Sequence, residues 1–106
     1  MTRPRSVVFG YHDIGVACLG ELLATGDDVA LVVTHGDRPD ENVWWRSMRE
    51  LADRHGVPVL VDPDLGSPDL AARLRALAPD FVFSFMFRAL LPGSLLEIPR
   101  LGSLNP

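Results

Sequence analysis

Residues 81–88 read Phe81-Val-Phe-Ser-Phe-Met-Phe-Arg88, an apolar run with a polar end, and residues 101–106 read Leu-Gly-Ser-Leu-Asn-Pro. A short apolar run that follows a turn at Pro79-Asp80 is typical of a strand buried inside a sheet. The second stretch predicts another strand, and this strand delivers Asn105 at its end. These two strands are the most informative part of the sequence, and the rest of the chain is interpreted outward from them.

Three further strands are predicted upstream, over residues 6–10, 29–34 and 57–61, separated by stretches with helical periodicity. The helical stripes share apolar residues three or four positions apart: Ile14, Cys18 and Leu22, then Trp44, Met48, Leu51 and Ala52, then Leu70, Leu74 and Leu77. Asp13 is expected to cap the first helix, and Pro58 suits a strand start or a sheet edge. This alternation predicts an α/β, Rossmann-like, doubly wound and mostly parallel sheet, truncated near the fifth strand.

Length and composition limit the class of protein. A chain of 106 residues with 47% hydrophobic content makes one domain at most. The net charge of −4, without a basic patch, makes nucleic-acid binding unlikely for this chain. No apolar run approaches the roughly 20 residues that a membrane span needs, and residues 1–5 lead directly into a strand. We therefore expect no membrane association and a cytoplasmic location.

Cysteine and histidine usage predicts neither a disulfide nor a metal site. Cys18 is the single cysteine, and it has no Cys or His at zinc-ligand spacing. We interpret it as a small hydrophobic residue on a helix. His35 lies in a polar turn and His55 ends a helix, and both are expected to have structural roles.

A ligand crevice is expected where the winding of the sheet reverses. Right-handed crossovers place the first and fourth strands side by side, and ligands bind beyond the carboxyl ends of the strands at that point. Residues 11–13, Tyr-His-Asp, and residues 87–91 then border the same crevice. His12 is a candidate for contact with a substrate; the alternative is a loop histidine bonded to a neighbouring backbone group. The turn 10–15 lacks the G-x-G-x-x-G spacing, which disfavours a dinucleotide.

Several segments together resemble the N-terminal half of the folate-dependent formyltransferases. They are Val7-Val-Phe-Gly-Tyr-His-Asp13, Val33-Thr-His-Gly-Asp-Arg-Pro-Asp40 and the two strands quoted above. The likeness is nearest to the formyltransferase domain of the bifunctional polymyxin-resistance enzyme, which formylates UDP-4-amino-4-deoxy-L-arabinose during lipid A modification. The resemblance implies that residues 1–106 form the N-terminal half of a catalytic domain. That domain would transfer a formyl group from 10-formyltetrahydrofolate to the amine of an amino-sugar nucleotide.

Two other functions stay open. One is methionyl-tRNA formyltransferase, which would add a nucleic-acid partner. The other is a flavodoxin-like binding module without chemistry of its own. The next codons of the gene distinguish them, because the resemblance implies a histidine at the next position.

The resemblance also implies roles for individual residues. Asn105 would be catalytic, with its amide stabilising the oxyanion of the tetrahedral intermediate. A histidine two positions later and a distant aspartate would lie in the remaining C-terminal part of the domain, so this stretch alone is expected to be inactive. The alternative for Asn105 is an ordinary turn, since Asn-Pro is a common turn dipeptide. An unpaired fifth strand would also favour association of copies into a homo-oligomer.

The donor site is implied for the segment after the fourth strand. Ala89, Leu90 and Leu91 would hold the pterin end of 10-formyltetrahydrofolate through backbone groups. Arg88 would orient the folate, with a surface ion pair as its alternative role. For the two leucines, the alternative is a core position leading into the next helix.

Overall fold

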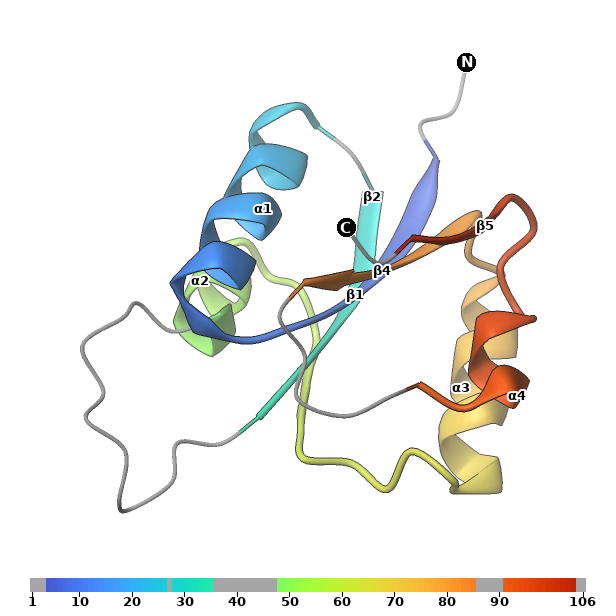
Figure 1. Cartoon of the computed structure of the whole chain (residues 1–106). Helices are drawn as coiled ribbons and strands as arrows, with labels where there is room; N and C mark the ends of the chain where they lie inside the picture. Colours follow the sequence, from blue (N-terminus) through green and yellow to red (C-terminus); the bar gives the residue numbers. More distant parts are fainter. Residues whose placement is uncertain (1–3, 27, 36–47, 86–90, 105–106) are drawn as a thin grey trace.

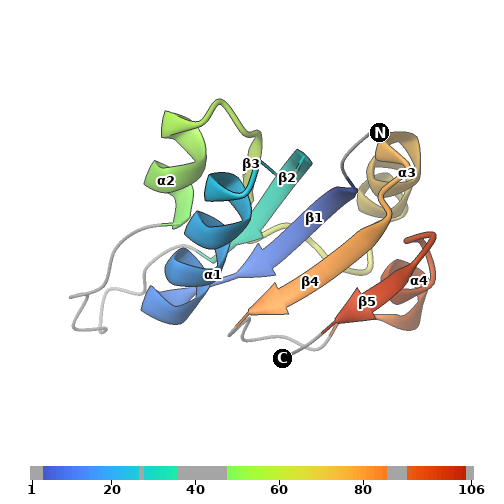
Figure 2. The same ribbon diagram turned by 90° about the horizontal axis from the view of Figure 1, so that it is seen from above.

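A computed structural model describes residues 4–26, 28–35, 48–85 and 91–104, with the backbone alone at 12–14 and 104. Within these ranges five parallel strands form one sheet in the order β3-β2-β1-β4-β5. The strands are β1 (Arg5–Gly10), β2 (Asp28–Thr34), β3 (Val59–Val61), β4 (Phe81–Phe85) and β5 (Gly102–Leu104). The helices are α1 (His12–Ala24), α2 (Met48–Arg54), α3 (Pro68–Leu77) and α4 (Gly93–Leu96). The predicted doubly wound α/β fold is confirmed, because β1 and β4 lie side by side and the order reverses between them (Figure 2).

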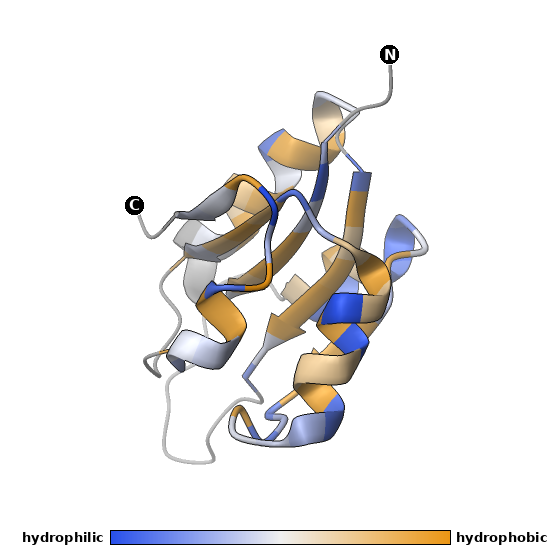
Figure 3. Ribbon diagram, turned by 90° about the vertical axis from the view of Figure 1, so that its right-hand side faces the viewer, coloured by the Kyte–Doolittle hydropathy of each residue, from blue (hydrophilic) through white to orange (hydrophobic). Residues whose placement is uncertain are grey.

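The helices cover the sheet on both faces (Figure 1). α1 and α2 pack on one face, and α3 and α4 pack on the other. Successive residues of β1 alternate between the faces: Val7 and Phe9 join the cluster under α3 and α4, whereas Val8 joins the cluster under α1 and α2. All three are fully buried, as expected for a parallel strand covered on both sides. Figure 3 shows hydrophobic colouring along the central strands and hydrophilic patches on the surface helices.

The start of α1 differs from the sequence-based expectation. Asp13 was expected to cap this helix, but the cap position belongs to Tyr11, which makes no side-chain capping bond. The backbone of Tyr11 is extended, and its N–H donates to the carbonyl of Phe85 at 3.1 Å. Because this bond holds the chain against the end of β4, the helix begins at His12 and Asp13 lies within its first turn.

The third strand is shorter than predicted. β3 begins at Val59, two residues after the expected start, and Pro58 precedes it. The carbonyl of Pro58 still accepts from the N–H of Val32 at 2.9 Å. Of the two expected positions for this proline, the sheet edge is confirmed, because Pro58 directly precedes the edge strand β3.

Apart from the start of α1, the predicted helices agree with the structure where it describes them. α3 begins after Ser67, whose hydroxyl accepts from the N–H of Asp69 at 3.1 Å, and Pro68 occupies the first turn. Cys18 is half-buried and packs against the cluster under α1 and α2, as expected for a small hydrophobic residue. Trp44, from the predicted second helix, lies outside the described residues. In the described part of the chain, no helix is long and apolar enough to cross a membrane.

Candidate functional site

The turn from β1 into α1 packs tightly at the point where the sheet order reverses. A Cβ atom at Gly10 would lie 2.9 Å from Met48 Sδ and 3.1 Å from the carbonyl oxygen of Phe85. At Gly15 the corresponding distances would be 2.8 Å and 3.3 Å. Glycine at both positions therefore lets α1 approach the end of β4 and the start of α2. These glycines serve packing, in a turn that lacks the dinucleotide-binding spacing.

Three side chains meet across the carboxyl ends of β1, β2 and β3. Tyr11 follows β1, His35 follows β2 and Asp62 follows β3. The rings of Tyr11 and His35 contact each other edge to face, with their centroids 5.7 Å apart and their planes at 75°. His35 Nδ1 lies 3.0 Å from Asp62 Oδ1. We call these three residues the rim cluster.

The hydrogen bond fixes the orientation of the imidazole in the rim cluster. An ionised carboxylate only accepts hydrogen bonds, so Nδ1 of His35 carries the proton and donates it to Asp62. The side chain of His35 is 12% exposed, whereas that of Asp62 is 58% exposed. A backbone bond from the N–H of Asp62 to the carbonyl of Thr34, at 2.9 Å, ties β3 to β2 beside this pair. The cluster therefore presents a carboxylate to solvent above a nearly buried imidazole.

Most of the predicted site residues fall outside the described parts. Arg88, Ala89, Leu90 and Asn105 are not described, so their predicted roles in donor binding and catalysis remain predictions. For His12 only the backbone is described, and it forms the first residue of α1.

Leu91 is the one predicted donor-site residue whose side chain is described. It is half-buried and packs against the apolar cluster under α3 and α4. Its side chain thus occupies the core position that was the alternative interpretation. The predicted folate contact involves the backbone and stays a prediction.

The rim cluster was missed from the sequence. His35 was assigned to a polar turn, and Asp62 was not singled out. The available signal was position, because each residue directly follows a predicted strand. The carboxyl ends of parallel strands meet at one edge of the sheet, so polar residues just beyond them come together.

Metal binding finds no support in the described residues. They contain no group of three or more His, Cys, Asp or Glu side chains that could hold a metal ion.

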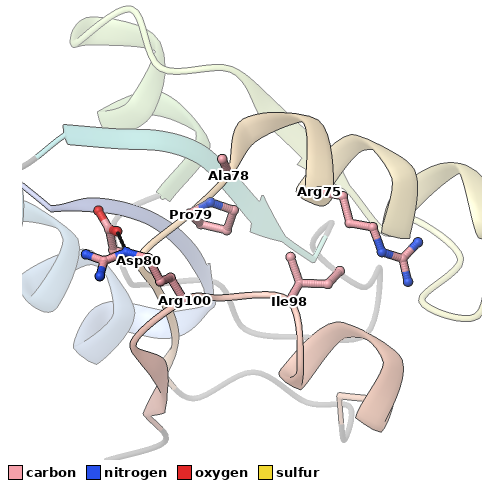
Figure 4. Close-up of a pocket in the computed structure, with 6 residues that line it drawn as sticks. All are labelled: Arg75, Ala78, Pro79, Asp80, Ile98 and Arg100. Atoms are coloured by element: carbon pink, nitrogen blue, oxygen red, sulfur yellow. Dashed lines mark hydrogen bonds and ion pairs between the residues drawn. The ribbon is translucent and has the colours of Figure 1, made fainter.

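A separate hollow of about 470 Å³ lies at the opposite, amino end of the sheet (Figure 4). Asp80 Oδ1 accepts from Arg100 Nε at 2.9 Å, and Asp80 Oδ2 accepts from the backbone N–H of Arg5 at 2.8 Å. The bond from Arg5, followed by the bond from Arg100, lowers the pKa of the Asp80 carboxyl. Because ligands of doubly wound sheets bind at the carboxyl ends of the strands, we take the edge of the sheet that carries the rim cluster as the candidate site. The hollow is lined by Arg75, Ala78, Pro79, Asp80, Ile98 and Arg100.

Comparison with known proteins identifies the fold. No protein-family model matches the chain. Glycinamide ribonucleotide transformylase 1 from Symbiobacterium toebii is similar with a TM-score of 0.67 and 24% identity, over 97% of this chain and 50% of that one. Phosphoribosylglycinamide formyltransferase from Streptococcus pneumoniae is similar with a TM-score of 0.62 and 16% identity, over 96% and 55%. The enzyme of the same name from Anaplasma phagocytophilum is similar with a TM-score of 0.64 and 17% identity, over 99% of this chain and 49% of that one.

These likenesses show that the chain has the fold found in formyltransferases of this kind, and that it spans about half the length of the proteins it matches. The predicted Rossmann-like α/β class is thereby confirmed. The expected resemblance to formyltransferases agrees with the fold of these structures. The nearer likeness to an enzyme of amino-sugar nucleotides remains a prediction.

Proposed function

We propose that this chain belongs to an N-formyltransferase that moves a formyl group from 10-formyltetrahydrofolate to the primary amine of an acceptor. The observation that carries the proposal is the sheet, whose order reverses between β1 and β4. That arrangement is shared along nearly the whole chain with three solved formyltransferase structures, at TM-scores of 0.62 to 0.67. The sequence likeness to the folate-dependent formyltransferases supports the same function independently.

The reaction exchanges one carbon–nitrogen bond for another. The lone pair of the acceptor amine attacks the formyl carbon, and a new C–N bond forms through a tetrahedral oxyanion. The bond from that carbon to N10 of the folate then breaks. The proton lost by the amine ends on N10, which gives tetrahydrofolate and the N-formyl acceptor. In this proposal the amide of Asn105 stabilises the oxyanion, the histidine implied beyond residue 106 handles the proton, and the implied aspartate raises the pKa of that histidine.

The donor and the acceptor are assigned to different parts of the crevice. Backbone groups of Ala89, Leu90 and Leu91, together with Arg88, hold the folate after β4. His12, at the start of α1, contacts the acceptor. No metal takes part in this assignment, because the proton and the oxyanion are handled by side chains alone.

For the acceptor we favour an amino-sugar nucleotide like UDP-4-amino-4-deoxy-L-arabinose. The loop Gly10-Tyr-His-Asp13 and the turn Thr34-His-Gly-Asp37 support this choice, because they resemble the enzyme acting on that substrate. A second candidate is phosphoribosylglycinamide, which the names of the three similar structures favour. Methionyl-tRNA is the third acceptor to be tested.

The decisive experiment is an acceptor panel with the natural protein that carries this chain. The protein is incubated with 10-formyltetrahydrofolate and, separately, with UDP-4-amino-4-deoxy-L-arabinose, phosphoribosylglycinamide or methionyl-tRNA. Mass spectrometry then detects the formylated acceptor, and absorbance follows the release of tetrahydrofolate. We expect transfer to the amino-sugar nucleotide. Transfer to another member of the panel would correct the acceptor, and transfer to none of them would reject the enzyme in favour of a binding module.

A further inference from the structure

The rim cluster and the proposed donor site follow different strands at the carboxyl end of the sheet. The donor is assigned to the segment after β4, whereas Tyr11, His35 and Asp62 follow β1, β2 and β3. The winding of the sheet reverses between β1 and β4, so the rim cluster lies on the β1 side of the reversal, and the segment proposed for the donor follows the strand on the other side. An acceptor amine must meet the formyl carbon between them. With the donor so assigned, the ends of β1, β2 and β3 are the part of the sheet left for the body of the acceptor.

Asp62 has a backbone conformation that calls for an explanation. Its φ is 49°, and among the described residues other than glycine only Ala78 shares a positive φ. For Ala78 the explanation is local, because it ends α3 and its N–H bonds the carbonyl of Arg75 at 3.0 Å. Asp62 follows a strand and caps no helix. Residues held in this region often lie at ligand-binding sites, where the strain places a side chain for use.

At this position the carboxylate of Asp62 forms a hydrogen bond with the imidazole of His35. Asp62 Oδ1 lies 3.0 Å from Nδ1 of His35, and the His35 ring in turn contacts the ring of Tyr11, a residue that is 7% exposed, in a T-shaped arrangement. The N–H of Tyr11 is bonded to the carbonyl of Phe85 at 3.1 Å, so the cluster is anchored to the middle of the sheet. A carboxylate fixed in this way stands where a ligand could meet it without rearrangement.

The chemistry of the cluster selects the part of a ligand that it can bind. The Asp62 carboxylate is 58% exposed and accepts hydrogen bonds, so it suits hydroxyl and amine groups. The same charge repels a phosphate. A sugar ring, with its hydroxyl groups, fits this description better than the phosphate part of either acceptor does.

We propose that the rim cluster is the acceptor-binding wall of the crevice, with Asp62 hydrogen-bonding hydroxyl or amine groups of the acceptor sugar and His35 positioning Asp62. This inference rests on the proposed formyltransferase function and adds a site for the acceptor to it. Tyr11 supports the imidazole and makes no contact with the acceptor in this proposal.

The test is Asp62→Asn in the natural protein, assayed with 10-formyltetrahydrofolate and whichever acceptor of the panel is formylated. Asparagine tolerates a positive φ and matches aspartate in size, so the fold is preserved while the charge is removed. We expect the KM for the acceptor to rise roughly ten- to a hundredfold, because the hydrogen bonds to the acceptor lose their charged partner. The KM for 10-formyltetrahydrofolate and the melting temperature should stay unchanged.

Two further variants separate binding from stability. Asp62→Gly removes the carboxylate and relieves the backbone, so it should raise the acceptor KM at least as much without lowering the melting temperature. Ala78→Gly relieves the same backbone conformation at the far end of the sheet, where no ligand is proposed. It should keep both KM values and raise the melting temperature slightly.

The outcomes distinguish the two proposals. If the wild-type protein formylates no acceptor, the proposed function fails and the acceptor wall fails with it. If the wild-type protein is active and Asp62→Asn leaves the acceptor KM unchanged, only the acceptor wall is rejected. Equal rises in both KM values, or a fall in melting temperature that accounts for the loss, would show a purely structural role and overturn the inference as well.

Discussion

The two ends of the sheet use carboxylates in different ways. At the amino end, Asp80 accepts from the backbone N–H of Arg5 and from Arg100, whose side chain is 70% exposed. At the carboxyl end, Asp62 accepts from His35, whose side chain is 12% exposed. One carboxylate is therefore paired with the backbone and with a solvated guanidinium, and the other with a nearly buried imidazole.

The difference separates a structural contact, made by Asp80, from a candidate binding site, which includes Asp62. Asp80 also joins neighbouring strands through its backbone, donating to the carbonyl of Arg5 at 2.7 Å and accepting from Leu101 at 2.8 Å. Its side chain adds to contacts that the backbone already makes, and an ion pair whose guanidinium is largely exposed contributes little. Asp62 instead has a positive φ and is bonded to the imidazole of His35, at the edge where ligands of such sheets bind. The bond between Asp80 and Arg100, at 2.9 Å, thus has a structural role, whereas the bond between Asp62 and His35, at 3.0 Å, belongs to the candidate site.

The largest expected effect is at the carboxyl end and concerns catalysis. In the natural protein, Asn105→Ala should lower kcat about a hundredfold or more, because the oxyanion loses a donor that acts mainly in the transition state. Binding of 10-formyltetrahydrofolate, measured by calorimetry, should barely change. The matched change at the amino end, Asp80→Asn, should leave kcat as it is. Full activity of Asn105→Ala would remove this residue from the mechanism.

The next effect concerns packing at the carboxyl end, where two glycines of α1 provide a matched pair. A Cβ atom at Gly15 would lie 2.8 Å from Met48 Sδ and 3.3 Å from the Phe85 carbonyl, so Gly15→Ala should destabilise the protein by about 1 to 3 kcal/mol. A Cβ atom at Gly20 would meet only Leu51 Cδ2, at 3.9 Å. Gly20→Ala should therefore stabilise by up to about 1 kcal/mol through helix propensity.

Urea unfolding of both variants measures these free energies. Opposite signs are expected from the same substitution in the same helix. Destabilisation of equal size at both positions would mean that helix α1 as a whole, and not its contact with β4, is sensitive to alanine.

Much of the fold could be predicted because its signals are local. The apolar run 81–85 and the run 6–10 mark central strands by length and composition, and the structure places them side by side. The cap of α1 could not be predicted in this way. It depends on the bond between Tyr11 and Phe85, residues far apart in the sequence, and this bond overrides the local preference for Asp13.

The location of the candidate site could be predicted from the sequence, but the residues that form it could not. The reversal between β1 and β4 follows from element order, so the crevice could be predicted from the sequence. The pairing of His35 with Asp62 could not, because it depends on the register between β2 and β3 and on the positive φ after Val61. The sequence shows which residues follow strands. It does not show which of them contact each other.

The smallest expected effect is at the amino end and depends on pH. The pKa of Asp80 is lowered from its ordinary value of 3.8, chiefly by the backbone N–H of Arg5 and then by Arg100. The ionised form therefore stabilises the native state above the ordinary pKa, and this contribution is lost as the pH falls through the lower native value. Asp80→Asn keeps an acceptor for Arg5 but removes the charge facing Arg100, so the variant should be slightly less stable at pH 7. Urea unfolding from pH 7 down to about pH 3 should show this gap in free energy staying constant at first and then narrowing below the ordinary carboxyl pKa. If the difference in unfolding free energy between variant and wild type widened with acidification, the lowered pKa would be contradicted. If that difference were as large as the one for Gly15→Ala, the Asp80 ion pair would be more than a minor structural contact.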